Sequence, residues 1–118
     1  MPTILVVDDE QPIREIVTRV LERSGHRVIA CPSASCADQI AGPIDLLLVD
    51  LVLPDVNGRE LTELLRKKWP NLPVILMSGY LAEQDFMPPA PSFFLQKPML
   101  PSAVVQAVNA LLKPTAGS

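Results

Sequence analysis

An apolar run that ends on a carboxylate constrains the fold of this chain more than any other feature. Residues 44–50 read Ile-Asp-Leu-Leu-Leu-Val-Asp, and a turn sequence containing Pro54, Asn57 and Gly58 follows. A strand that is apolar on both faces must be covered on both faces, as the central strands of parallel sheets are. The charge of Asp50 at the end of such a strand is poorly placed for stability and well placed for chemistry. We therefore expect a parallel sheet with Asp50 acting at its edge.

The composition indicates one domain with an aliphatic core. The chain has 118 residues, of which 48% are hydrophobic and only 4% aromatic, and this length suffices to bury roughly two-thirds of the unfolded surface. A net charge of −3 without a basic cluster argues against direct binding of nucleic acid. Neither a membrane span nor a targeting segment is recognisable, so we expect no membrane contact and a cytoplasmic location. In that compartment Cys31 and Cys36 are expected to be reduced thiols.

Four further apolar runs of strand length alternate with helical patterns, at residues 3–7, 28–31, 74–77 and 93–95. Apolar residues at three- and four-residue spacing predict helices after Pro12, after Pro32, after Gly58 and around Leu100–Leu111. The connection between the last two strands differs, because a helix over residues 81–86 could last only about one turn before the prolines that follow. We predict one domain over residues 1–113 and a flexible tail over residues 114–118.

This alternation predicts an α/β fold, a doubly wound parallel sheet with helices on both faces. In such sheets, ligands bind outside the carboxyl ends of the strands. Four of the five predicted strands bring a polar or charged side chain to that edge: Asp8 and Asp9, Asp50, Ser78, and Lys97.

These side chains suit phosphoryl transfer. Three neighbouring carboxylates raise one another's pKa unless a cation intervenes, and oxygen ligands on open loops suit Mg²⁺. Lys97 supplies a mobile positive charge for a phosphoryl oxygen, and Ser78 supplies a hydroxyl group. A carboxylate, a metal, a lysine and a hydroxyl group together could transfer a phosphoryl group to Asp50.

The same residues, in this order and spacing, resemble the receiver domain of two-component response regulators along the whole chain. The resemblance rests on Asp8-Asp9, the segment from Asp50 to Gly58, Ser78 and Lys97-Pro98. It implies a flavodoxin-like fold of five parallel strands in the order 2-1-3-4-5. It also implies a histidine kinase or a histidine phosphotransfer protein as the phosphoryl donor to Asp50.

The resemblance further implies a role for each site residue. Asp9, Asp50 and the backbone carbonyl of Val52 would hold Mg²⁺, with Asp8 contributing directly or through water. Ser78 would sense the phosphoryl group and Lys97 would pair with it. Enzymatic activity would be limited to self-phosphorylation and slow autodephosphorylation, unless the chain is part of a hybrid histidine kinase. The Lys97-Pro98 bond is often cis in this family.

Three features depart from the usual pattern. Phe94 occupies the switch position where a tyrosine is expected, and the fourth helix should be short or missing. Ser78-Gly79-Tyr80 and Val52 are more similar to receivers of hybrid sensor kinases than to those of DNA-binding regulators. A phosphate-independent pseudo-receiver, an interaction module with the same fold, is therefore the alternative. A haloacid dehalogenase-type hydrolase is disfavoured, because Val52 stands where its second aspartate would be.

Simpler interpretations also exist for single residues. One of the two aspartates Asp8 and Asp9 could cap the following helix. Asp55 and Asn57 are assigned to the turn and to helix capping rather than to catalysis. The cognate kinase, the output and the oligomeric state are not predicted.

Overall fold

Five parallel strands form one sheet in the order β2-β1-β3-β4-β5, as predicted. The computed structural model describes residues 2–79 and 87–112. Its strands are β1 (Thr3–Val7), β2 (Arg27–Cys31), β3 (Leu46–Asp50), β4 (Val74–Ser78) and β5 (Ser92–Gln96). The central strand β3 is buried along its whole length, which is what its unbroken apolar sequence requires.

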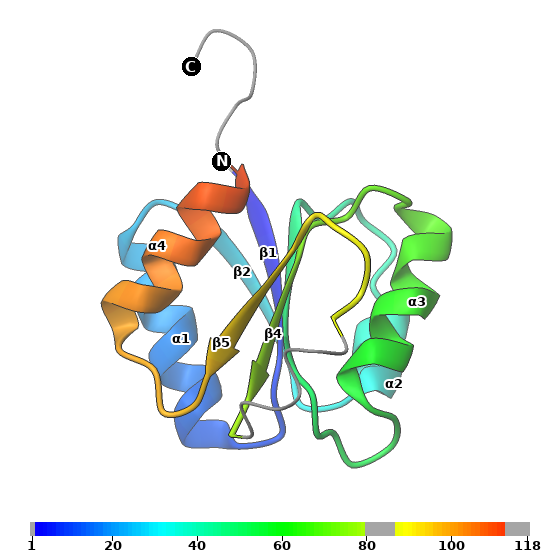
Figure 1. Cartoon of the computed structure of the whole chain (residues 1–118), viewed down its shortest axis with the longest axis horizontal. Coiled ribbons are helices and arrows are strands. Elements are labelled where there is room, and N and C mark those ends of the chain that lie inside the picture. Colours follow the sequence, from blue (N-terminus) through cyan, green and yellow to red (C-terminus); the bar gives the residue numbers. More distant parts are fainter. Residues whose placement is uncertain (1, 80–86, 113–118) are drawn as a thin grey trace, which may run out of the picture.

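Helices cover both faces of the sheet. They are α1 (Gln11–Arg23), α2 (Ala34–Asp38), α3 (Gly58–Lys68) and α4 (Pro101–Leu112). Figure 1 shows α1 and α4 together on one face, and α2 and α3 on the other. Pro12 lies in the first turn of α1, where its missing N–H is not needed. The side chain of Asn57 accepts a hydrogen bond from the Glu60 N–H and so caps α3, as predicted for this residue.

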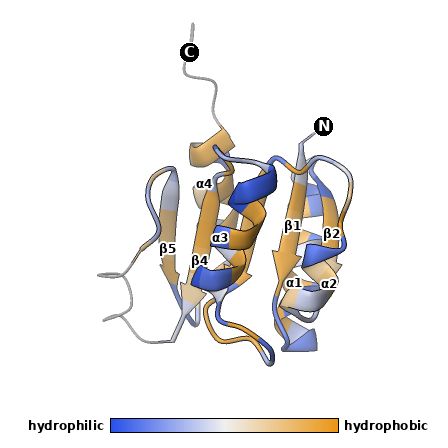
Figure 2. Ribbon diagram, turned by 90° about the vertical axis from the view of Figure 1, so that its right-hand side faces the viewer, coloured by the Kyte–Doolittle hydropathy of each residue, from blue (hydrophilic) through white to orange (hydrophobic). Residues whose placement is uncertain are grey.

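Each face of the sheet has its own aliphatic core. Alternate residues of each strand point to opposite faces, so Leu47 and Val49 pack under α2 and α3, whereas Leu46 and Leu48 pack under α1 and α4. The hydropathy colouring of Figure 2 shows the strands as a mainly apolar layer, and α3 with hydrophilic and hydrophobic residues side by side. Strong burial of the middle strands fixes the strand ends, and therefore the site, in place.

The connection between β4 and β5 is not helical in its described part. Residues 87–91 run without regular structure, and Met87 packs against the core cluster under α2 and α3. Arg66 of α3 holds this proline-rich segment through hydrogen bonds from its guanidinium group to the carbonyl oxygens of Pro89 (2.7 Å) and Pro91 (3.0 Å). The same group also donates to the carbonyl oxygen of Leu72 before β4 (2.9 Å). The helical turn predicted over residues 81–86 and the predicted tail over 114–118 lie outside the described residues.

The expectation of two reduced thiols is wrong in this structure. Cys31 ends β2 and Cys36 lies in α2, and their sulfur atoms form a disulfide with a Cα–Cα distance of 5.7 Å. The chain turns sharply at Pro32 and Ser33, which brings the two side chains together. A spacing of five residues does not reveal this, because disulfide formation depends on Cα separation and side-chain direction. The peptide bonds Ala90-Pro91 and Lys97-Pro98 are cis.

Candidate functional site

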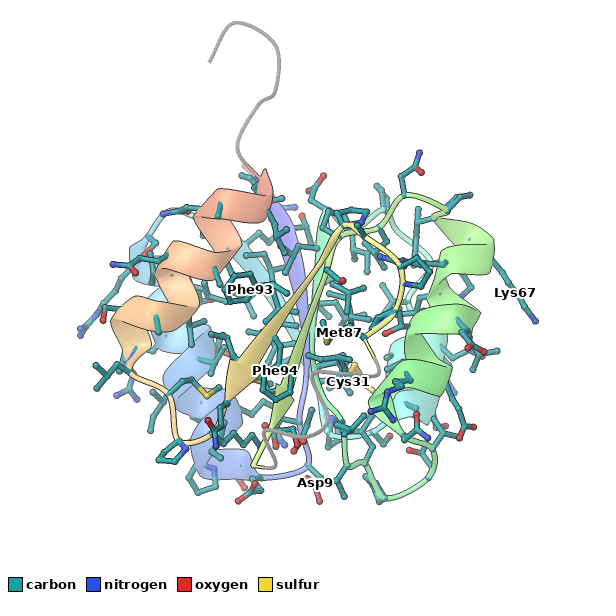
Figure 3. All side chains as sticks on the ribbon, viewed as in Figure 1. Asp9, Cys31, Lys67, Met87, Phe93 and Phe94 are labelled. Carbon is teal, nitrogen blue, oxygen red and sulfur yellow. A yellow bond between two sulfur atoms is a disulfide. The ribbon has the colours of Figure 1, made fainter. Side chains whose placement is uncertain are left out.

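The predicted polar residues meet at the carboxyl edge of the sheet. Asp8 follows β1, Asp50 and Ser78 are the last residues of β3 and β4, and Lys97 follows β5. Asp8 is fully buried, and Asp50 and Ser78 are 5% and 2% exposed. Asp9 is exposed at the edge of the molecule where the strands end (Figure 3). Parallel strands bring residues that are distant in sequence to one edge, so the predicted convergence occurs.

Lys97 is the centre of the site. Its Nζ atom lies 2.8 Å from Oδ2 of Asp50 and 3.1 Å from Oδ2 of Asp8. A third carboxylate, that of Glu10, lies 3.3 Å from the same nitrogen and is more exposed. The backbone N–H of Lys97 donates to the carbonyl oxygen of Ser78 at 2.7 Å, which fixes the start of the lysine side chain beside β4. One ammonium group therefore neutralises carboxylates from two different strands.

Burial and charge act in opposite directions on these groups. Burial raises the pKa of Asp8, although hydrogen bonds from the Glu10 N–H and from Lys97 act to lower it. Burial alone would lower the pKa of Lys97, but its hydrogen bonds and charge interactions with Asp50 and Asp8 outweigh that effect and raise this pKa above its ordinary value. Lys97 therefore keeps its proton. The hydrogen bonds and the positive charge of Lys97 do not fully offset the cost of burying the Asp8 carboxylate.

The acidic side chains fit a divalent cation. Asp8, Asp9, Glu10 and Asp50 each offer a carboxylate oxygen, and these oxygens lie within 4.8 Å of one another. The ammonium group that already bridges Asp8 and Asp50 shows that these two carboxylates converge on a positive charge. Oxygen donors at an open edge are the ligand set of Mg²⁺. Glu10 was not among the predicted site residues; its position directly after the acidic pair was the available signal.

The acidic pair does not cap α1 through its side chains. Glu10 is the N-cap residue and makes no capping hydrogen bond with its side chain. Instead, Oδ1 of Asp8 accepts the Glu10 N–H at 2.9 Å, and the carbonyl oxygen of Asp8 accepts a hydrogen bond from the Arg14 guanidinium group at 2.7 Å. These contacts set the orientation of Asp8 toward Lys97. Arg14 is a second contributor that the sequence pattern did not single out.

The loop after Asp50 is built around that residue. Oδ1 of Asp50 accepts the backbone N–H of Val52 at 3.1 Å, and the Val52 side chain is 62% exposed. The Gly58 N–H donates to the carbonyl oxygen of Leu51 at 2.8 Å and closes the loop. Asp55 lies in the loop before α3 but caps α2. Its carboxylate accepts hydrogen bonds from two backbone N–H groups of α2, those of Ala34 (3.1 Å) and Ser35 (2.8 Å). These contacts lower the pKa of Asp55.

Phe94 is half-buried on the edge strand β5, where it pairs with Leu76. Alternation along β5 places Phe93 and Phe94 on opposite faces of the sheet, as Figure 3 illustrates. Phe94 therefore lies on the face of α3 and of the proline-rich segment, residues 87–91. Phe93 lies on the face of α4 and is 43% exposed.

An apolar groove opens beside Lys97. It has a volume of about 530 Å³, and its walls come from one face of α1, from the loop after Lys97 and from the start of α4, including Ile13, Ile16, Met99 and Pro101. Ile16, on the apolar stripe of α1, is 53% exposed. The groove therefore joins an exposed apolar surface to the charged site.

The fold and the site together define a flavodoxin-like α/β domain with a cation-compatible acidic pocket. The response regulator receiver domain model matches residues 4–109, and the chain belongs to this family. It is 42% identical over 82 residues to the DNA-binding transcriptional regulator NtrC of Azospirillum brasilense, covering 65% of this chain and 16% of that protein. It is 28% identical over 116 residues to the response regulator SaeR of Staphylococcus aureus, covering 95% of this chain and 51% of that protein.

Solved structures agree with this assignment. The receiver domain of the hybrid histidine kinase CckA superimposes with a TM-score of 0.80 at 29% identity, covering 94% of this chain and 99% of that domain. The chain thus spans about half or less of the curated relatives named above. Among residues 2–79 and 87–112, no helix is long and apolar enough to cross a membrane.

Proposed function

We propose that this receiver domain accepts a phosphoryl group on Asp50 from a phosphohistidine partner and changes conformation in response. The observation that carries the proposal is the buried Asp50 carboxylate, paired with Lys97 at the open edge of the sheet. In the transfer, Oδ2 or Oδ1 of Asp50 attacks phosphorus, the phosphorus–nitrogen bond breaks, and its electron pair returns to the imidazole. Lys97 then pairs with a phosphoryl oxygen, and the hydroxyl group of Ser78 contacts another.

The acidic pocket supports a role for Mg²⁺ in this reaction. In the proposal, Asp8, Asp9, Asp50 and the backbone carbonyl of Val52 hold the ion. When bound, Mg²⁺ would neutralise charge on the transferring phosphoryl group. The protein residues position the acceptor oxygen and keep Lys97 protonated. Activity would consist of this self-phosphorylation and of slow autodephosphorylation.

The groove between α1 and α4 supports a helical protein as the donor. A phosphohistidine must approach Asp50 closely, so the donor has to dock beside the pocket. The apolar groove of about 530 Å³ adjoins Lys97 and presents the exposed side chain of Ile16. We therefore propose a histidine kinase or a histidine phosphotransfer protein, in the cytoplasm, as the partner. Phe94 is the proposed switch residue, and its ring has no hydroxyl group to hydrogen-bond as it moves.

Beryllofluoride, which mimics an aspartyl phosphate, tests the proposal. With Mg²⁺ present, it should shift the amide resonances of residues around Asp50, Ser78 and Lys97, and Asp50→Asn should abolish these shifts. Glu63→Gln, which changes an exposed carboxylate on α3, should respond like the wild type. Shifts that persist in Asp50→Asn would contradict Asp50 as acceptor. A wild type without any response would favour the pseudo-receiver alternative.

A further inference from the structure

The Cys31–Cys36 disulfide joins the end of β2, which hydrogen-bonds to Asp8, to α2, which is capped by Asp55 of the loop after Asp50. We infer that the Cys31–Cys36 pair is a reversible disulfide whose redox state tunes the affinity of that pocket for Mg²⁺. The inference rests on the proposed function for the identity of the ion. It assigns a second site of chemical modification, whose co-reactant is a dithiol protein or a small dithiol.

Cys31 connects the disulfide to the acidic pocket directly. It is the last residue of β2, pairs with Val7 and is 1% exposed. Its carbonyl oxygen accepts the backbone N–H of Asp8 at 3.1 Å. Asp8 in turn forms an ion pair with Lys97. A change in the position of Cys31 is therefore transmitted to a pocket carboxylate through one backbone hydrogen bond.

Cys36 connects the disulfide to the pocket from the other side. It lies in α2, whose first N–H groups are bound by Asp55, and Asp55 belongs to the loop that starts at Asp50. That loop carries Val52, whose N–H binds Asp50. The disulfide therefore ties the end of β1 and β2 to the helix that holds the loop. The disulfide thus links the segment that carries Asp8 to the loop that follows Asp50, and the proposed Mg²⁺ ligands come from these two segments.

The helix α2 depends on these ties. It contains only five residues, which is too short for a helix to be stable without outside contacts. At the start of the helix, the Cys36 N–H donates to the hydroxyl group of the N-cap residue Ser33 over 3.3 Å, a long hydrogen bond. Opening the disulfide would leave α2 held by its capping contacts and by the packing of Ala34 and Ala37. The loop with Asp55 would then be less firmly positioned.

The two cysteine residues differ in burial, which gives the reaction a direction. Cys36 is half-buried near the surface, whereas Cys31 is buried. A reductant thiolate would attack Sγ of Cys36, the sulfur–sulfur bond would break, and the electron pair would go to Sγ of Cys31, which takes up a proton. The second thiol of the reductant then attacks the mixed disulfide, releases Cys36 as a thiol and becomes oxidised itself. Disulfides of cytosolic proteins commonly have such redox roles.

The reduced chain should keep its fold. Cys31 remains a small apolar side chain in a strand that is paired along its length with β1. Both redox forms can therefore be compared as folded proteins. The oxidised form should bind Mg²⁺ more tightly, because its ligands are held in place before binding.

The experiment compares the full chain after treatment with oxidised or reduced dithiothreitol. Alkylation followed by mass measurement should find no free thiol in the oxidised form and two in the reduced form. Mg²⁺ affinity, measured from the dependence of melting temperature on Mg²⁺ concentration, should be about fivefold higher for the oxidised form, at the lower end of typical couplings between sites. Cys36→Ser should show the affinity of the reduced form after either treatment.

Linkage provides a second readout. The ratio of reduced to oxidised dithiothreitol that half-reduces the protein should rise by the same factor, about fivefold, when Mg²⁺ is added. Two alkylated cysteines after oxidation, or equal Mg²⁺ affinity of both forms, would overturn the inference and leave the proposed function standing. Absence of Mg²⁺ binding in both forms would overturn the inference and the metal site of the proposed function together.

Discussion

A side chain at Gly58 would collide with the backbone of Asp50. A Cβ atom there would lie 2.6 Å from the carbonyl oxygen of Asp50 and 3.1 Å from the Cα atom of Leu51. The first residue of α3 thus packs directly on the end of β3, with no space for a methyl group. This contact brings the N-terminus of α3 and the end of β3 together and fixes the loop between them.

Gly58→Ala should therefore destabilise the chain and disturb the site. We expect a loss of about 1–3 kcal/mol in the free energy of unfolding, because backbone must move to admit the methyl group. Urea denaturation measures this loss, and amide spectra report on Asp50. Gly42→Ala is the matched control, since a Cβ atom at Gly42 meets nothing within 4 Å. Equal stability of the two variants would contradict the close approach.

Lys97→Met should destabilise the metal-free protein and increase its response to Mg²⁺. The change leaves Asp8 and Asp50 without the ammonium group between them, and removal of one partner from a buried ion pair costs about 3 kcal/mol. Mg²⁺ should restore part of the loss, so its effect on melting temperature should exceed that in the wild type. Lys67→Met removes an exposed lysine that points away from the molecule (Figure 3) and serves as control.

Asp55→Asn should lower stability in a pH-dependent way. The folded protein lowers the pKa of Asp55 below its ordinary value of 3.8, chiefly through the hydrogen bond from the Ser35 N–H. The ionised group therefore stabilises the fold above pH 3.8, and this contribution disappears as the pH falls through the lowered pKa. The melting temperatures of wild type and variant should differ at pH 7 and converge in acid. A difference that grows in acid would refute the capping role.

Arg66→Lys should release the proline-rich segment from α3. Lysine can replace only part of the hydrogen bonding to Leu72, Pro89 and Pro91, because it lacks the planar fork of the guanidinium group. We expect a loss of about 2 kcal/mol in unfolding free energy. The amide of Val74, which donates to the Pro91 carbonyl oxygen, should exchange faster with solvent. Lys67→Met again provides the control. Unchanged exchange at Val74 would contradict the role of Arg66 in holding the proline-rich segment.

Much of the fold could be predicted because buried positions require apolar residues, and their spacing can be read from the sequence. The unbroken apolar run of β3 identifies a central parallel strand. The three- and four-residue spacing of apolar residues in α1 identifies the face of this helix that packs on the sheet. The site was predictable for a related reason: parallel strands bring their carboxyl ends to one edge, so the residues that follow them must meet. Arg14 was missed because a charged residue on an amphipathic helix usually faces solvent. Glu10 was missed although its position after the acidic pair was a signal, and the tertiary structure brings its carboxylate to Lys97.

The sequence alone determined the sheet, its strand order through the family resemblance, and the meeting of Asp8, Asp50, Ser78 and Lys97. The sheet and the meeting of these residues follow from apolar period and chain direction, which are local properties, whereas the strand order came from the resemblance alone. Only the tertiary structure decided that Lys97 bridges Asp8 and Asp50, that Asp55 caps α2, that Arg66 holds the proline-rich segment and that Cys31 pairs with Cys36. Each of these contacts depends on the distance and direction of side chains, and packing sets both.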